Sequence, residues 1–367
     1  MTDLFEFSDD IGPSKVVGIY DLKIPLKAIL VVDNVATGPA IGGVRMAPDV
    51  SIAECFRLAR AMTFKNAAAG LPHGGGKSVI FADPAMPDEK KERVIRAFAR
   101  AIGQIVDYIA GPDMGTNETC MAWIKDEIDR AAGLPREIGG IPLDEIGATG
   151  YGLAIAADAV AEAGHIQLDG ARVVVQGYGA VGRHVARFLK DRGAILVATS
   201  DSRGATSNRD GLEIDALDDL KAAGGSVGEF SGGKRIDQDA LVGVSCDIWI
   251  PAARPDVLTV ENVDRIKARL VLQGANIPAT LEAEQLLHER GILSIPDFVA
   301  NAGGVISASV EYHGGSERSA IEAIAEKIHR NTREMLSVAL TKKIPPRKAA
   351  EQMARERVEK AMRLRRG

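Results

Sequence analysis

Two lysines and an aspartate in the first third of the chain are the side chains best suited to acid–base chemistry. Lys65 lies in "MTFKNAAAG", Lys77 in "LPHGGGKS" and Asp113 in "AGPDMGTN". A desolvated lysine beside another cation has a lowered pKa and can act as a general base near neutral pH. A second lysine that stays charged can hold a carboxylate, and an aspartate between them can shuttle protons. Each residue alone would usually be a solvated charge. The small residues around both lysines and the turn around Asp113 make the set more specific.

The glycines before Lys77 raise a second possibility, a loop that binds phosphate. A Walker A loop has the pattern G-x-x-x-x-G-K-[ST], with a strand before it and a helix after it. The first glycine of that pattern would have to stand where the chain has Leu71, and Gly70 is one position too early. The flanks are also reversed, because a helix over 51–69 is predicted before the glycines and a strand, "SVIFADP", after them. The spacing therefore argues against an NTP-binding loop.

The elements that would position these residues suggest two domains. The chain has 367 residues, which is long for a single core. Its N-terminal part mixes predicted strands, "LKAILVVDN" and "SVIFADP", with predicted helices over 51–69, about 88–109 and about 117–131. A loop rich in Gly, Pro and Ile, "GLPREIGGIPLDEIGATG", follows and marks a boundary.

Beyond that loop, short apolar strands alternate with helices. Predicted helices over about 151–164 and about 180–191 alternate with the strands "ARVVVQ" and "AILVATS", and "CDIWIP", "ARLVLQ" and "GILSIP" follow. Fully apolar strands in such alternation predict a parallel sheet covered by helices on both faces. The expected fold is α/β, with two domains around a cleft, the second a Rossmann-type doubly wound sheet. The first domain comprises 1–146 and C-terminal helices over about 335–367, and the second comprises 147–334.

A dinucleotide fingerprint supports the second domain. In "VVVQGYGAVGRH" the pattern G-x-G-x-x-G directly follows an apolar strand and opens a helix, as the dinucleotide-binding fold requires. Its glycines allow the tight turn, the close approach of the pyrophosphate and the packing of helix on strand, while the helix N-terminus faces the phosphates. The residues expected at the cofactor phosphates are Gly177, Gly179, Ala180, Val181 and Gly182.

The choice between NAD and NADP depends on two residues after the second strand of this motif. Asp201 ends that strand about 20 residues after the glycines, where a carboxylate accepts bonds from the adenosine ribose hydroxyls and favours NAD. Arg203 is close enough in sequence to pair with a 2′-phosphate, so NADP stays open. The expected cofactor is NAD.

Composition limits the class of protein. The chain is 46% hydrophobic and 26% charged, as in ordinary globular proteins, and its net charge of −5 gives no reason to expect nucleic acid or an anionic membrane as a partner. No apolar run approaches the roughly 18 residues of a membrane span. Three scattered cysteines suggest a reducing cytoplasm without disulfides, and six dispersed histidines make a protein-bound metal unexpected.

The chemistry-bearing segments together resemble one enzyme family. The stretches "GPAIGGVRM", "MTFKNAAAGLPHGGGK", "GPDMGT", "ATGYG", "GYGAVG", "SDSRGA" and "IPDFVANAGGVI" occur in the order and context of the Glu/Leu/Phe/Val dehydrogenases, over essentially the whole chain. By this resemblance Lys77 is the catalytic lysine, Asp113 the acid that transfers protons, and Lys65 the lysine that binds the substrate α-carboxylate. Family members form homo-oligomers, so one is expected here.

The resemblance also implies further site residues and the reaction. Asn276 and Asn301 would line the cofactor–substrate cleft, Thr149 would lie near the nicotinamide amide, and Gly42 would contact substrate. The implied reaction is reversible oxidative deamination of an L-amino acid. Hydride leaves Cα for the nicotinamide, a water activated by Lys77 attacks the iminium, and ammonia leaves to give the 2-oxo acid.

The substrate side chain is predicted from two positions. Glutamate-specific members of the family resemble one another in a lysine and a serine that hold the side-chain carboxylate, and this chain has Ile41 and Ala308 there. A γ-carboxylate buried without partners costs several kcal/mol, so an apolar, branched-chain or aromatic, amino acid is preferred, as in the leucine and phenylalanine enzymes. Glutamate is the alternative, because "SDSRGATSNRDGLE" looks more like glutamate dehydrogenases.

Two functions of other classes are less consistent with the sequence. A catalytically silent NAD-binding sensor or scaffold would not need to keep Lys65, Lys77 and Asp113 together. A dehydrogenase of 2-hydroxy acids would normally pair a histidine with an acid, and His73 has no acidic partner in its own segment.

Overall fold

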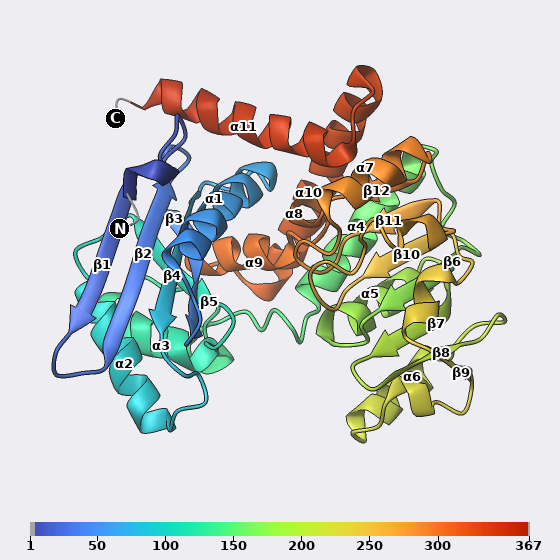
Figure 1. Ribbon diagram of the computed structural model, residues 1–367, viewed down its shortest axis with the longest axis horizontal. Coiled ribbons are helices and arrows are strands. Elements are labelled where there is room, and N and C mark those ends of the chain that lie inside the picture. The colour runs from blue at the N-terminus through green and yellow to red at the C-terminus, as the bar shows by residue number, and fades with distance from the viewer. Residues whose placement is uncertain (1–3, 366–367) are drawn as a thin grey trace. The chain divides into compact units, whose positions relative to one another are not determined.

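A computed structural model describes residues 4–365, which form two compact units (Figure 1). The first comprises the described parts of Met1–Pro142, Val305–Ala320 and Glu351–Gly367, and the second comprises Leu143–Gly304 and Ile321–Ala350. The two-domain α/β architecture predicted from the sequence is confirmed. The first three and last two residues of the predicted domains lie outside the described residues.

The unit boundaries differ from the predicted ones at both ends. The first unit stops at Pro142 rather than at 146, and its C-terminal part starts at Glu351 rather than at about 335, with Val305–Ala320 added. Buried contacts explain the difference. The Glu311 carboxylate binds backbone N–H groups that precede Pro142, which joins 305–320 to the first unit. Arg347 pairs with acidic residues of the second unit, which keeps 321–350 there.

The first unit is built on a five-stranded mixed sheet in the order β1-β2-β4-β3-β5. β2 is antiparallel to both of its neighbours, β1 and β4, whereas β4, β3 and β5 are parallel to one another. The strands are β1 (Lys15–Asp21), β2 (Leu26–Asn34), β3 (Ala40–Ala47), β4 (Gly74–Phe81) and β5 (Tyr108–Pro112). Of these strands, only β2 and β4 were predicted from the sequence.

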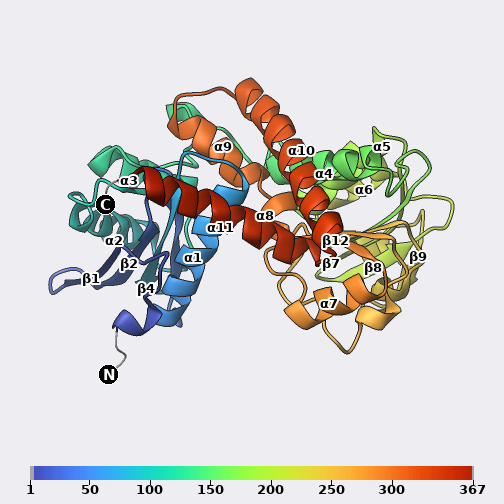
Figure 2. The ribbon, with the colours of Figure 1, turned by 90° about the horizontal axis from the view of Figure 1, so that it is seen from above.

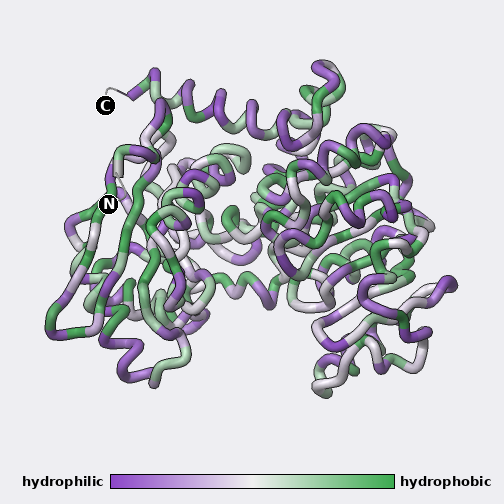
Figure 3. Tube along the Cα trace, in the orientation of Figure 1, coloured by the Kyte–Doolittle hydropathy of each residue, from purple (hydrophilic) through white to green (hydrophobic). Residues whose placement is uncertain are grey.

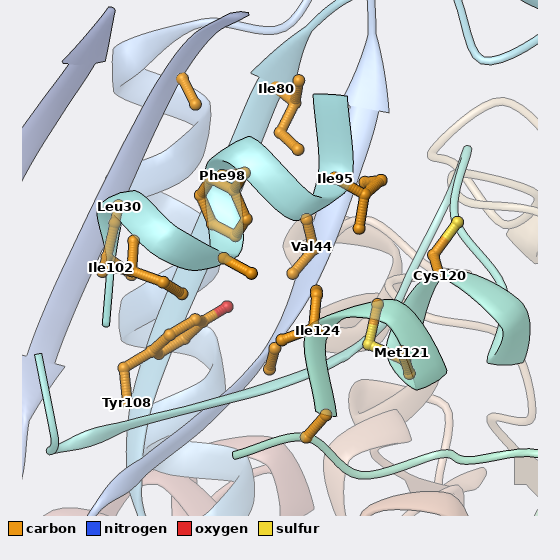
Figure 4. Close-up of a cluster of buried hydrophobic side chains, with 14 of the residues drawn as sticks. Leu30, Val44, Ile80, Ile95, Phe98, Ile102, Tyr108, Cys120, Met121 and Ile124 are labelled. Atoms are coloured by element: carbon orange, nitrogen blue, oxygen red, sulfur yellow. The ribbon is translucent and has the colours of Figure 1, made fainter. Parts of the chain in front are cut away.

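Helices cover both faces of this sheet, which explains why most residues of its central strands are buried. α1 (Ile52–Ala68) packs on the face that includes Val31 and Val79. α2 (Asp88–Ala101) and α3 (Glu118–Ile128) pack on the opposite face, where Figure 4 shows Leu30, Phe98 and Tyr108 in one cluster. Successive strand residues point to opposite faces, so both sets of β2 residues are buried. The helix predicted over 88–109 is shorter than expected, because β5 begins at Tyr108.

The second unit has a seven-stranded sheet in the order β12-β11-β10-β6-β7-β8-β9. The five strands from β12 to β7 are parallel, as predicted, and β8 and β9 extend the sheet antiparallel. The strands are β6 (Arg172–Gln176), β7 (Ile195–Asp201), β8 (Gly204–Ser207), β9 (Lys234–Ile236), β10 (Ile248–Pro251), β11 (Leu270–Leu272) and β12 (Leu293–Ile295). The helices are α4 (Ala148–Glu162), α5 (Ala180–Lys190), α6 (Ile214–Ala222), α7 (Leu281–Glu289) and α8 (Asp297–Ala300).

Three helices complete the chain: α9 (Gly303–Tyr312), α10 (Glu317–Lys342) and α11 (Pro346–Leu364). The C-terminal helices predicted over about 335–367 correspond to the end of α10 and to α11, which are separated where Lys343 takes a left-handed φ of 53° and a proline pair follows. Figure 3 shows that α11 is largely hydrophilic along its length. Within residues 4–365, no helix combines the length and the apolarity needed to cross a membrane.

Candidate active site

The glycines before Lys77 begin a strand and do not form a phosphate loop. β4 starts at Gly74, where an added Cβ would lie 1.7 Å from the Asn34 carbonyl oxygen on β2. At Gly75 a Cβ would lie 2.0 Å from the Thr63 nitrogen on α1. Real Cβ atoms do not tolerate such distances, so glycine is required for α1 and β2 to pack this closely on β4. The sequence argument against an NTP-binding loop agrees with this geometry.

Lys77 and Asp113 form a buried ion pair. Lys77 lies on β4 and is 5% exposed, and Asp113 directly follows β5. The Lys77 Nζ donates to Asp113 Oδ2. β3 lies between the two strands, and its Gly43 leaves the necessary space: a Cβ there would lie 2.7 Å from Asp113 Cβ and 3.0 Å from Lys77 Nζ. The structure thus brings together two residues that the sequence predicted to act as a pair.

The surroundings shift the pKa values of both groups. Burial lowers the pKa of the Lys77 ammonium, and the charge of Asp113 opposes this without cancelling it. Burial also acts to raise the pKa of the Asp113 carboxyl, but the nearby Lys77 and Arg45 cations outweigh it and hold that pKa below its usual value. A lysine whose pKa is lowered by desolvation can give and take a proton closer to neutral pH than a solvated lysine.

Arg45 is a member of this site that the sequence analysis did not assign. It lies on β3 two residues after Gly43, and therefore on the same face of the sheet. Its Nε is 3.1 Å from Asp113 Oδ2, and its Nη1 donates to Glu54 Oε1 on α1 at 2.6 Å. Asp113 therefore keeps a cationic partner even when Lys77 is neutral. The sequence signal for Arg45 was its position two residues after Gly43. In a strand this spacing places both residues on one face, but this segment was not predicted to be a strand.

Two predicted substrate-binding residues of the first unit, Lys65 and Gly42, lie on α1 and β3, the elements that pack against β4. Lys65 is in the last turn of α1, half-buried, and α1 covers the face of the sheet on which Lys77 lies. Gly42 on β3 packs directly against the backbone of β4. A Cβ at this position would lie 1.7 Å from the Gly76 carbonyl oxygen, so only glycine fits.

The structure also joins the two positions used to predict the substrate side chain. Ile41 belongs to a buried apolar cluster with Ile109 and Ala132, and Ala308 and Tyr312 from α9 pack against it. Ile41 and Ala308 are far apart in sequence, and the fold brings them to one cluster.

Replacing Gly43 by alanine tests the close approach at the ion pair. The new methyl group would overlap Asp113 and press on Lys77, so we expect kcat to fall by about 10- to 100-fold while the fold persists, because a misplacement of about 1 Å has effects of this size. Gly18→Ala is the matched control, since Gly18 lies in β1 of the same sheet and a Cβ there meets nothing within 4 Å. Steady-state kinetics with a circular dichroism spectrum checks this, and equal activities of the two variants would contradict it.

In the second unit, the glycine fingerprint has the geometry of a dinucleotide site. Gly177 has a φ of 100°, and a Cβ there would lie 2.7 Å from Ala253 Cβ, just after β10. Gly182 packs on Gly177, whose carbonyl oxygen would lie 1.8 Å from a Cβ at Gly182. Gly179 is exposed at the start of α5, and its Cβ position is open. The strand order reverses between β6 and β10, and such switch points are where open α/β sheets bind nucleotides. Ala180 and Val181 form the first turn of α5.

Asp201 has internal partners for both carboxylate oxygens. Its side chain is 8% exposed, and although burial acts to raise its pKa, the donors around it hold the pKa well below its usual value. These donors are the backbone N–H groups of Arg203, Gly204 and Val227 (2.9, 3.1 and 3.0 Å), the Ser226 hydroxyl (2.8 Å) and the Lys221 ammonium (2.8 Å). This carboxylate therefore has less capacity for ribose hydroxyls than the sequence prediction assumed.

The remaining predicted residues also lie in the second unit. Asn301 Nδ2 donates to Asn276 Oδ1 at 3.1 Å, so these two predicted residues are in direct contact. Asn301 Oδ1 is buried and has no hydrogen-bond partner among the described residues, so it could accept a bond from a ligand amide. Thr149 lies in the first turn of α4, and its Oγ1 would be 3.6 Å from a Cβ on Gly304.

Arg347 is a second residue that the sequence analysis missed, and it supports the asparagine pair. Its guanidinium binds Glu284 at 2.6 and 2.8 Å and Asp297 Oδ1 at 2.8 Å. Asp297 Oδ2 accepts the Ile277 N–H at 2.8 Å. This network ties the start of α11 to the loop after Asn276 and to α8.

Within the part of the chain that the structure describes, no group of three or more His, Cys, Asp or Glu residues is arranged to hold a metal ion. The three cysteines are buried and free.

Comparisons with known proteins agree with this geometry. Residues 139–366 match the family model "Glutamate/Leucine/Phenylalanine/Valine dehydrogenase", and 22–130 match "Glu/Leu/Phe/Val dehydrogenase, dimerisation domain". The chain is 38% identical to a glutamate dehydrogenase of Aeropyrum pernix over 90% of this chain and 85% of that protein. It is also 38% identical to an NADP-specific glutamate dehydrogenase of Saccharolobus shibatae, over 76% of this chain and 69% of the relative. The crystal structure of an L-tryptophan dehydrogenase from Nostoc punctiforme superimposes with a TM-score of 0.77 at 26% identity, covering 98% of this chain and 99% of the other. Fold, site and comparisons together place the chain in the Glu/Leu/Phe/Val dehydrogenase family.

Proposed function

We propose that this NAD(P)-dependent amino acid dehydrogenase uses Lys77 and Asp113 as its acid–base pair. The observation that supports the proposal is the buried ion pair between Lys77 Nζ and Asp113 Oδ2, with Arg45 as a second cation on the same carboxylate. The reaction is the reversible oxidative deamination of an L-amino acid to the 2-oxo acid and ammonia. Lys65 holds the substrate α-carboxylate in this proposal.

The residues of the pair have distinct tasks. The bound nicotinamide supplies the acceptor for the hydride that leaves Cα. Lys77 in its neutral form takes a proton from the water that attacks the resulting iminium carbon. Asp113 passes protons between Lys77 and the departing amine, and Arg45 keeps its carboxylate ionised while Lys77 is neutral. Burial of Lys77 makes its neutral form accessible, as the direction of its pKa shift indicates.

The substrate best supported by the relatives is glutamate. Two relatives that are 38% identical to this chain carry the name glutamate dehydrogenase. They support glutamate better than the apolar amino acid preferred from the sequence, so we propose L-glutamate as the first candidate.

An apolar or aromatic L-amino acid is the second candidate, favoured by one observation. Ile41 and Ala308 meet in a cluster of apolar side chains, and a γ-carboxylate buried against it without a cation would cost several kcal/mol. The similarity to an L-tryptophan dehydrogenase is compatible with this candidate.

The ratio of kcat/KM values decides between the candidates. Purified protein would be assayed with L-glutamate, L-leucine, L-phenylalanine and L-tryptophan under identical conditions. A value at least about tenfold higher for glutamate supports the first candidate, and means that a group outside the Ile41 cluster binds the γ-carboxylate. A preference for an apolar amino acid by the same factor supports the second candidate and excludes the first.

For the cofactor, we propose that Asp201 does not select NAD strongly and that NADP is accepted. Both Asp201 oxygens have internal donors, and Arg203 and Arg235 line a hollow beside the same turn. The name of the Saccharolobus shibatae relative is compatible with NADP use. NAD, expected from the glycine motif, would then be accepted as well.

Arg203→Ala tests this proposal. Because a guanidinium can pair with a 2′-phosphate but has no such partner in NAD, we expect the KM for NADP to rise about tenfold and the KM for NAD to stay within about twofold. Arg209→Ala is the control, an exposed arginine in the loop after β8. Equal changes for both cofactors would contradict a role of Arg203 in discrimination.

We also propose that the chain forms a homo-oligomer, because 22–130 match the family's dimerisation domain. Light scattering on the purified protein would give the number of subunits.

A further inference from the structure

Glu311 on α9 is a buried carboxylate held by backbone N–H groups alone. It is 7% exposed, and its two oxygens accept three hydrogen bonds. Oε1 accepts from the N–H of Gly133 at 2.7 Å and of Leu134 at 3.0 Å, and Oε2 accepts from the N–H of Ile141 at 2.7 Å. None of the lysines, arginines and histidines that the structure describes forms an ion pair with it. A buried carboxylate is costly unless its oxygens accept hydrogen bonds, and here the segment 133–141 supplies the donors.

The two segments that Glu311 joins both contribute to the apolar cluster around Ile41. The segment 133–141 directly follows Ala132, which is fully buried in that cluster. α9 contributes Ala308 and Tyr312, which lie three residues before and one residue after Glu311. α9 is labelled in Figure 2, and its residues from Val305 onward belong to the first unit. The hydrogen bonds of Glu311 therefore fix the spacing between Ala132 and the α9 residues across the cluster.

We propose that Glu311 is a positioning residue for substrate selection, which sets the width of the site for the substrate side chain by clamping 133–141 to α9. The proposal rests on the proposed function and takes the Ile41–Ala308 cluster, the positions used to predict the substrate side chain, as part of that site. The role of Glu311 goes beyond the proposed function, because Glu311 itself contacts no substrate and determines selectivity through Ala132 and Ala308. It also requires the carboxylate form of this side chain, and not only its size.

The chemistry of the clamp explains why an amide cannot replace it. A carboxylate accepts through both oxygens, whereas a glutamine has one oxygen and an NH2 group that donates. In Glu311→Gln, either the Ile141 N–H or the pair from Gly133 and Leu134 would face a donor. An unpaired buried N–H is costly, so the segment should move away from α9.

The experiment compares Glu311→Gln with wild type on two substrates of different side chain, L-glutamate and L-leucine. We expect the ratio of their kcat/KM values to change by at least about threefold, the KM of the better substrate to rise about tenfold, and the Kd of the dinucleotide to stay unchanged, because its fingerprint lies in the other unit. Glu311→Asp keeps a carboxylate acceptor on a shorter side chain. Its ratio of kcat/KM values should lie between those of wild type and Glu311→Gln. It serves as the test variant if the glutamine variant does not fold.

Glu317→Gln is the matched control. Glu317, like Glu311, lies in the stretch Val305–Ala320 of the first unit. It also binds the segment 133–141, through Arg136, but this ion pair is exposed on the surface. An exposed pair contributes little, so selectivity should not change. If Glu317→Gln changed the ratio as much as Glu311→Gln, the clamp would not be specific to the buried carboxylate and the proposal would be overturned.

Hydrogen exchange of the amides of Gly133, Leu134 and Ile141 separates positioning from a merely structural role. We expect these amides to lose protection in Glu311→Gln together with the change in selectivity. Loss of protection with an unchanged selectivity ratio would overturn the proposal and leave Glu311 as a structural residue. A wild-type protein that turns over no amino acid would instead overturn the proposed function, a result visible before any variant is made.

Discussion

Replacing Lys77 by alanine should lower kcat by about 10³-fold, with dinucleotide binding unchanged. General acid–base groups contribute about 10²- to 10⁴-fold, and Lys77 is the buried cation at the Asp113 carboxylate whose pKa is lowered toward the working range. The loss should appear in kcat more than in the KM of the amino acid, because the proposed mechanism uses Lys77 in the chemical step and Lys65 to hold the α-carboxylate.

The variant should fold, which makes the result interpretable. Asp113 keeps Arg45 as a cationic partner at 3.1 Å, so the carboxylate is not left alone when Lys77 is removed. Lys90→Ala, on the exposed side of α2, is the control for the loss of a lysine as such. Stopped-flow and steady-state absorbance at 340 nm measure kcat, and fluorescence titration measures dinucleotide binding. A fall of less than tenfold would remove Lys77 from the chemical step.

Replacing Asp113 by asparagine should lower kcat by about 10²- to 10⁴-fold and shift the pH profile. The Asp113 charge opposes the burial that lowers the pKa of Lys77, so its removal lowers that pKa further. Lys77 works as a base in its neutral form, which is lost as the pH falls through its pKa. The acidic limb of the kcat profile should therefore move to lower pH in the variant.

The measurement is kcat as a function of pH between about pH 6 and about pH 10, which covers the region below the ordinary lysine pKa of about 10.4. Asp126→Asn on α3 is the control, a largely exposed aspartate paired with Arg96 at the surface. If the acidic limb of the kcat profile stayed in place or moved to higher pH in Asp113→Asn, a group other than Lys77 would control that limb.

The sequence was sufficient to single out Lys77 and Asp113, which the structure places in contact, but not Arg45, which pairs with the same carboxylate. Lys77 and Asp113 stand in glycine-rich segments whose order is specific, so their roles followed from the resemblance. The contact between Arg45 and Asp113 could not be predicted without the strand order. Arg45 reaches Asp113 because β3 lies between β4 and β5 in the sheet. The paired glycines of "AIGGVRMA" weaken the local strand signal, since glycine disfavours strands, and β3 was not predicted.

Long-range contacts also limited the prediction for the second unit. The glycine fingerprint depends on a local turn, and the structure has the expected backbone there. Asp201 was placed correctly at the end of a strand, but Lys221 in the last turn of α6, and Ser226 and Val227 after that helix, donate to its carboxylate. No local pattern indicates such partners.

The limits of the two units were missed for the same reason. They depend on Glu311 and Arg347, whose partners lie tens of residues or more away in the sequence. Sequence periodicity predicts which segments are helices, but it contains no signal for the unit on which each helix packs.

The central claim is that this chain oxidises L-amino acids at the Lys77–Asp113 pair, and one assay tests it most directly. Purified protein is mixed with an L-amino acid and NAD or NADP, and reduced dinucleotide at 340 nm is compared with the ammonia released. The account predicts equimolar formation of both products with wild type, and almost none with Lys77→Ala. Binding of the dinucleotide without reduction by any L-amino acid, or undiminished turnover by the Lys77→Ala variant, would contradict it.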